Sequence, residues 1–205
     1  METSEQTPVS EKIISVLKKA AIELEEFRLK AALGKAEARD AYEGAKRTFN
    51  KYVHEAKLRL ADVRDVANEK SIKLKTHFET LQVQLALGKA ESKEAFELQA
   101  KKISKVLNEI EALIKKNKTA DLYYTKLQME IEKFRIKLDI LKLQYELRKL
   151  GVREEFEEKK KDFSIKLSDI KKRLLKKEED AESTWEHFRD EISVAYSHLK
   201  KMFVR

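Results

Sequence analysis

The residues best suited to chemistry are four histidines and many carboxylates, and their spacing argues against a metal centre. A di-iron helical bundle uses Glu-x-x-His pairs on two of its helices. No histidine here has a glutamate three positions before it, because those positions hold Lys51, Leu74, Thr184 and Ala195. The chain also has no cysteine, which excludes thiolate ligands and a cysteine nucleophile. We therefore expect no metal ion and no cofactor.

The glycines and carboxylates give no better support for catalysis. Gly34, Gly44, Gly88 and Gly151 are isolated, whereas a phosphate-binding loop needs its glycines close together. The carboxylates have lysine or arginine neighbours at helical spacing, which is typical of ion pairs on a solvated helix face. We expect a protein that is not an enzyme and has no small-molecule substrate.

One stretch of the chain is strongly basic. Between residues 159 and 177 only Asp162 and Asp169 oppose nine basic side chains, and such a patch can bind nucleic-acid phosphates. However, it is rich in lysine, lacks interleaved aromatic residues and wraps around its helix. We favour the alternative, a solvated face that pairs with acidic stretches of a neighbouring chain. The patch comprises Lys159, Lys160, Lys161, Lys166, Lys171, Lys172, Arg173, Lys176 and Lys177.

The composition predicts the elements that must carry these residues. Charged residues make up 40% and apolar residues 41% of the chain, with only four glycines and one proline, as in coiled coils and long helices. We expect residues 1–7 to be a disordered tail and residues 8–205 to form a single elongated helical domain. The acidic N-terminus is unlike a targeting peptide, and the longest uncharged stretch, 80–88, is too short to span a membrane. We expect a soluble, cytoplasmic protein.

A three-fold internal repeat organises the chain. Residues 33–43 recur at 87–97, 54 positions later, and a weaker copy follows 60 positions beyond. Equivalent apolar residues flank the copies, for example Leu24, Phe78 and Leu138. Apolar residues step by threes and fours in each unit, which is typical of a coiled-coil seam. We expect repeat units at about 8–66, 69–117 and 119–178, then a terminal helix at 181–203.

The glycines at the unit centres, Gly34, Gly88 and Gly151, have two interpretations. A glycine inside a helix lets another helix approach closely, whereas a glycine just past a helix caps its end. We favour glycines inside helices and attribute the phase slip of the seam, such as the eleven-residue step from Tyr145 to Phe156, to local unwinding of a supercoil. The expected fold is all-α, a bundle of long antiparallel coiled-coil helices with three long repeat helices and a shorter C-terminal helix.

Two apolar stripes are candidate interaction surfaces. The third unit has a second stripe on a different face, which predicts a multi-helix bundle that serves as a platform for assembly. The stripe of the terminal helix is either a docking face for a membrane, granule or partner, or a lid on the bundle. We favour the lid, because membrane-surface helices are usually basic. The stripes are Ile136, Ile140, Leu143 and Leu147, and Trp185, Phe188, Ile192, Tyr196, Leu199 and Phe203.

The C-terminal part of the chain resembles a known family. Trp185 leads an amphipathic helix, Tyr196 follows eleven positions later, and Phe203 stands near the end. This pattern, after a long charged helix, resembles the closing helix of small bacterial, largely cyanobacterial-type, stress-response coiled-coil proteins. The resemblance covers about residues 121–203. It implies a structural or stress-associated role and no active-site residues.

Together, these patterns predict a non-enzymatic structural or interaction protein. It would be a self-associating scaffold or stress-associated protein, with another copy or another helical protein as its partner. Two alternatives stay open. In one, the helices open and coat a membrane or granule surface. In the other, which is the weaker, the basic patch binds nucleic acid.

Overall fold

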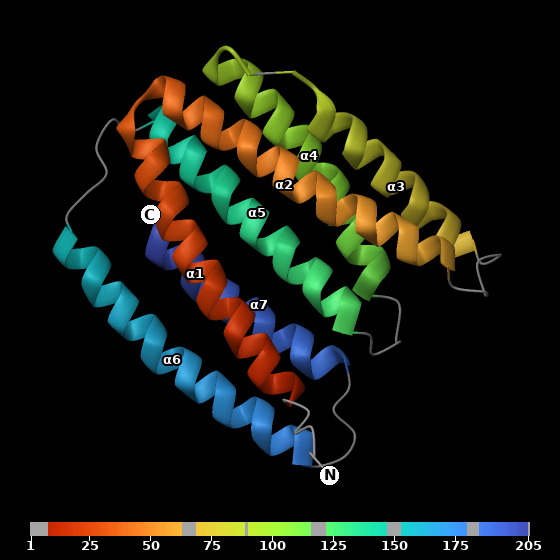
Figure 1. Cartoon of the computed structure of the whole chain (residues 1–205), viewed down its shortest axis with the longest axis vertical. Helices are drawn as coiled ribbons and strands as arrows, with labels where there is room; N and C mark the ends of the chain where they lie inside the picture. Colours follow the sequence, from red (N-terminus) through yellow and green to blue (C-terminus); the bar gives the residue numbers. More distant parts are fainter. Residues whose placement is uncertain are drawn as a thin grey trace, which may run out of the picture.

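The computed structural model describes residues 8–62, 69–88, 90–115, 122–146, 153–179 and 185–204, and these ranges hold seven helices and no strand. The predicted tail, residues 1–7, lies outside them. An all-α bundle is therefore what the structure shows. Consecutive helices run in opposite directions (Figure 1). The helices are α1 (Val9–Leu33), α2 (Lys35–Asp62), α3 (Glu69–Ala86), α4 (Lys93–Lys115), α5 (Leu122–Glu146), α6 (Arg153–Glu179) and α7 (Trp185–Phe203).

Each unit is broken at its centre, so the expectation of three long repeat helices is wrong. α1 ends just before Gly34, and Gly88 lies in the break between α3 and α4. Gly151 lies outside the described residues, between the end of α5 and the start of α6. An unbroken helix of 54 residues would be about 80 Å long, whereas the described helices have 18 to 28 residues. The phase slips of the seam thus mark turns at which the chain folds back.

The seven helices form two four-helix bundles that share one helix (Figure 1). In the first bundle, α2, α3, α4 and α5 pack as a closed ring of neighbours. In the second, α1, α5, α7 and α6 do the same, and α1 also packs against α2. α5 and α6 belong to one repeat unit, yet their described residues do not pack together. α5 is therefore the common centre of the fold.

The shared position of α5 explains why that helix has two apolar stripes. From the first stripe, Phe134 stacks on Phe49 of α2 with ring centroids 4.4 Å apart, inside the first bundle. From the second stripe, Ile136 and Ile140 are 2% and 0% exposed. They share a helix face with Asp139, whose Oδ2 lies 2.6 Å from Nζ of Lys200 on α7. Each stripe therefore supplies one bundle core.

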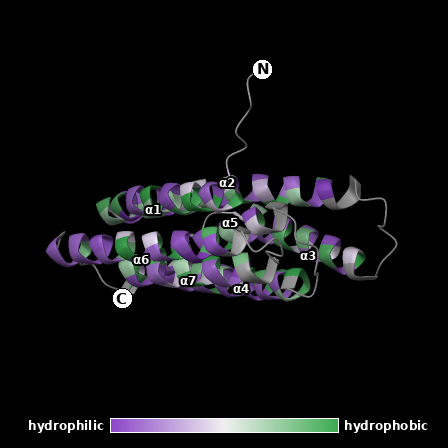
Figure 2. Cartoon of the chain, turned by 90° about the horizontal axis from the view of Figure 1, so that it is seen from below, coloured by the Kyte–Doolittle hydropathy of each residue, from purple (hydrophilic) through white to green (hydrophobic). Residues whose placement is uncertain are grey.

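The second bundle is not fully antiparallel, contrary to the expectation. Because helix direction alternates along the chain, the odd-numbered helices α1, α5 and α7 run the same way (Figure 1). α5 packs against both α1 and α7, so both of these pairs are parallel. Figure 2 shows α1 and α2 along one side of the molecule and α4 and α7 along the other. Antiparallel packing holds around the ring of the first bundle.

Candidate functional site

The stripe of α7 is buried against the rest of the bundle. Phe188, Ile192, Tyr196, Leu199 and Phe203 are all buried. The ring of Phe203 lies 5.7 Å from that of Phe156 on α6, and burial raises the pKa of Tyr196 well above its usual value. The side chain of Trp185 lies outside the described part of the chain. The described residues of this stripe therefore pack against the bundle, as the lid interpretation predicted.

The second stripe of α5 is not an exposed platform, which corrects the expectation from the sequence. Ile136 and Ile140 are buried, and Leu143 is half-buried. Leu147 lies outside the described residues. The extra apolar surface was attributed to a further protein chain, but the second bundle of the same chain covers it.

Side chains of the basic patch form ion pairs that link α6 to α1 and α7. Glu25 and Glu11 of α1 lie 3.6 Å from Lys160 and 2.6 Å from Lys171, and Glu191 of α7 lies 2.7 Å from Arg173. Lys159 and Lys172 pair with acidic residues of α6 itself. Lys161, Lys166 and Lys176 are exposed, and the side chain of Lys177 is outside the described set. The acidic partners predicted on a neighbouring chain are therefore supplied largely by this one.

A charge cluster, which sequence reasoning missed, joins buried residues of α5 to Glu23 of α1, whose side chain is 46% exposed. Nζ of Lys133 lies 2.8 Å from the carboxylate of Glu23 and 2.9 Å from that of Glu130. Glu130 and Lys133 are each 6% exposed. Nζ of Lys137 lies 3.9 Å from Glu23. The α5 face between the two stripes carries Glu130, Lys133 and Lys137 at spacings of three and four residues. That spacing is the only sequence signal, since Glu23 lies 110 positions before Lys133.

The pKa values of this cluster show competition between burial and pairing. Burial raises the pKa of the Glu130 carboxyl, and Lys133 opposes the rise. Burial disfavours the Lys133 ammonium, but the carboxylates of Glu130 and Glu23 outweigh it and raise its pKa. Burial, aided by the charge of Lys133, lowers the pKa of Lys137. Buried polar or charged groups specify the arrangement of helices in some proteins, and we infer such a positioning role for this cluster.

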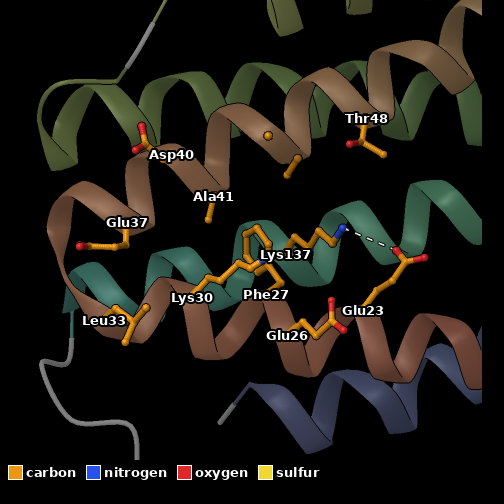
Figure 3. Close-up of a pocket in the computed structure, with 12 residues that line it drawn as sticks. Glu23, Glu26, Phe27, Lys30, Leu33, Glu37, Asp40, Ala41, Thr48 and Lys137 are labelled. Carbon is orange, nitrogen blue, oxygen red and sulfur yellow. Dashed lines mark ion pairs between the residues drawn. The ribbon is translucent and has the colours of Figure 1, made fainter.

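Above this cluster, α1 and α2 leave an open groove of about 560 Å³ (Figure 3). Phe27 and Lys137 lie between the two helices (Figure 3). Gly44 also borders the groove, and a Cβ added there would meet no atom within 4 Å, so its missing side chain leaves space. The second unit has Leu98 at the equivalent position. The other lining residues are Glu23, Glu26, Lys30, Leu33, Glu37, Asp40, Ala41, Ala45 and Thr48.

A second polar network closes the turn between α3 and α4. Lys46 of α2 is 1% exposed, and its Nζ donates a hydrogen bond to the carbonyl oxygen of Leu87 at 2.7 Å. Gln99 Nε2 donates to the carbonyl of Gly88 at 3.0 Å, and Tyr42 donates to Gln99 Oε1 at 3.1 Å. These bonds satisfy carbonyl groups beyond the end of α3. The network is structural, because it binds the chain's own backbone.

Other classes of site find no support in the described ranges. No group of three histidine, cysteine, aspartate or glutamate residues there could hold a metal ion. Among the helices described, none is long and apolar enough to cross a membrane. No family model, curated protein or solved structure matches the chain. The resemblance of residues 121–203 to stress-response proteins therefore stays a prediction.

Proposed function

We propose that the protein is a non-enzymatic scaffold that associates through helix faces left uncovered by its own fold. Its partners would be further copies of the chain or other helical proteins. The observation that carries this proposal is a set of exposed aliphatic residues at equivalent places in two repeat units. Leu29 and Val83 are 56% and 60% exposed, and Leu33 and Leu87 are 76% and 38% exposed.

Single exposed aliphatic residues are common on protein surfaces and need no explanation. Here Leu29 and Leu33 of α1 have counterparts 54 positions later, Val83 on α3 and Leu87 just past its end. The third unit has leucine at both equivalent positions, 143 and 147, and the face of α5 that carries them is used for packing. The exposed positions thus belong to a face that this chain already uses to bind a helix.

The charge and groove chemistry also support a binding role rather than catalysis. Lys137 has a lowered pKa, but its Nζ lies 3.9 Å from the carboxylate of Glu23, which is also paired with Lys133. The same proposal includes coiled-coil packing of the helices, an organisation in three repeat units and a stress-associated role. It also includes a cytoplasmic location, which the absence of cysteine supports.

Light scattering of the purified chain over a wide concentration range tests self-association. We expect a mass above the 24.0 kDa of one chain that grows with concentration. The variant Val83→Lys, a change at a 60% exposed residue of α3, should shift the mass toward one chain. Ile165→Lys, a change at a 56% exposed residue of α6, is the matched control and should not. A mass of one chain at every concentration would rule out self-association.

A further inference from the structure

One face of α1 is apolar, uncovered and equivalent to a covered face of α5. We call Ile22, Glu26, Leu29 and Leu33 the outer stripe of α1. Ile22, Leu29 and Leu33 are 59%, 56% and 76% exposed. The repeat offsets of 54 and then 60 positions relate the outer stripe to the second stripe of α5. This face is therefore exposed in α1, whereas in α5 Ile136 and Ile140 are buried and Leu143 is half-buried.

The face of α5 shows what kind of element covers such a stripe. It packs against α7, an amphipathic helix with large apolar residues at Phe188, Ile192, Tyr196 and Leu199. Ile136 and Tyr196 border the same groove between α5 and α7. Beside the apolar contact, Lys200 of α7 pairs with Asp139 of α5 at 2.6 Å.

The acidic residue of this contact recurs in the other units. Glu25 of α1 and Glu79 of α3 stand at the positions equivalent to Asp139. α1 therefore has both parts of the α7-binding arrangement, an apolar stripe and a neighbouring carboxylate. Glu25 lies 3.6 Å from Lys160, an exposed pair of the kind that contributes little and exchanges readily.

We propose that the outer stripe of α1 and the groove between α1 and α2 form a docking site for an amphipathic helix of another protein. This inference rests on the proposed scaffold role and names its partner. The helix has the chemistry of α7, with large apolar residues at i, i+4, i+7 or i+8 and i+11 and a lysine or arginine beside them. Such a helix laid in a groove buries its apolar anchors and leaves its polar face in water.

The differences between α1 and α5 define the charge of the partner. Where α5 has Ile140, α1 has Glu26, and Glu37 and Asp40 of α2 also line the groove. Glu23 adds a further carboxylate, and the cations of the groove are Lys30 and Lys137. A basic edge on the incoming helix is therefore favoured. Gly44 leaves room on α2 for larger side chains of the partner.

The same charges argue against a lipid surface as the occupant. Anionic membranes attract basic surfaces, whereas the carboxylates that line this groove outnumber its two lysines, Lys30 and Lys137. A second copy of this chain is also a poorer occupant, since its own α7 is already buried in its second bundle. A helix from a different protein meets neither obstacle.

Fluorescence anisotropy of a labelled peptide tests the proposal. The peptide has the sequence of residues 185–203 and serves as the α7-like probe, titrated with the intact chain. We expect saturable binding, weakened on the order of tenfold or more by Ile22→Lys with Leu29→Lys, since a buried charge opposes apolar docking. Glu26→Lys should weaken it less, and Ile165→Lys should leave it unchanged. A peptide with Ile192→Asp is the control probe and should not bind.

The outcomes separate this inference from the scaffold role. Absence of peptide binding, or binding that Ile22→Lys with Leu29→Lys does not alter, overturns the docking site. If light scattering still shows self-association that these substitutions abolish, the scaffold role stands and the occupant is a second copy. Binding to anionic vesicles that the same substitutions abolish would also overturn the helical partner.

Discussion

The two bundles are built from different parts of the chain, although they share α5. The first consists of four consecutive helices, α2 to α5, and every neighbour in its ring is antiparallel. The second brings the N-terminal helix α1 together with α5, α6 and α7, and it includes parallel pairs. Contacts between distant parts of a chain cost more loop-closure entropy. We therefore expect the second bundle to form later during folding, with α5 coupling the two so that they unfold together.

The largest effect should come from a change in α5 itself. Phe134 is 2% exposed and stacks on Phe49, so Phe134→Ala should lower the free energy of unfolding by about 3–5 kcal/mol. Because α5 serves both bundles, we expect one cooperative transition in urea followed by circular dichroism. Ile72→Ala, at a 57% exposed position, is the control. Two separate transitions in the wild type would break the coupling that we infer.

The charge cluster should matter next, because it links the buried pair Glu130 and Lys133 of α5 to Glu23 of α1. Lys133→Met would leave Glu130 buried without its cation, which should cost on the order of 3 kcal/mol. The pKa of Glu130 in the folded chain is raised above its ordinary value of 4.5. The contribution of this group to stability is therefore fully present below pH 4.5 and is lost as pH rises through the folded pKa. The deficit of the variant should therefore shrink at acidic pH in urea titrations. The pair Glu130→Leu with Lys133→Met should recover most of the loss, and a deficit independent of pH would contradict this assignment.

A smaller effect should distinguish α6 from the first bundle. α6 packs only on α1 and α7 in the described structure, and exposed ion pairs with Glu11, Glu25 and Glu191 accompany that packing. Such pairs contribute less than about 1 kcal/mol each and are screened by salt. Added sodium chloride should speed hydrogen exchange in α6 more than in α4. Equal changes in both helices would remove the contrast between the bundles.

The smallest expected effect is a pH dependence in the second bundle. Nδ1 of His198 on α7 lies 3.5 Å from Nζ of Lys166 on α6. Burial, then the charges of Lys166 and Lys201, lower the His198 pKa from 6.5. The folded chain then binds fewer protons than the unfolded chain, so stability present above pH 6.5 is lost as pH falls through the folded pKa. His198→Gln should flatten this dependence in thermal melts, and an unchanged slope would refute it.

The sequence predicted the element type and the faces that pack, but not which helices meet. Periodicity identified both stripes of α5 because apolar spacing is a local property. The turns were missed because the phase slip at Gly34 and Gly88 was attributed to supercoil unwinding. The pairing of Glu23 with Lys133 depends on the docking of helices far apart in the chain, and nothing in local spacing selects that partner. For the same reason, the basic patch was assigned acidic partners on another chain rather than on α1 and α7.

The most direct test of the central claim is hydrogen exchange of the intact chain with and without the 185–203 peptide. The claim is that α1 leaves open the face that α7 covers on α5. It predicts that added protection is confined to the second half of α1 and the first turns of α2, around the groove. Protection gained in α3 or α6, increased exchange in α7, or no change at saturating peptide would contradict the claim.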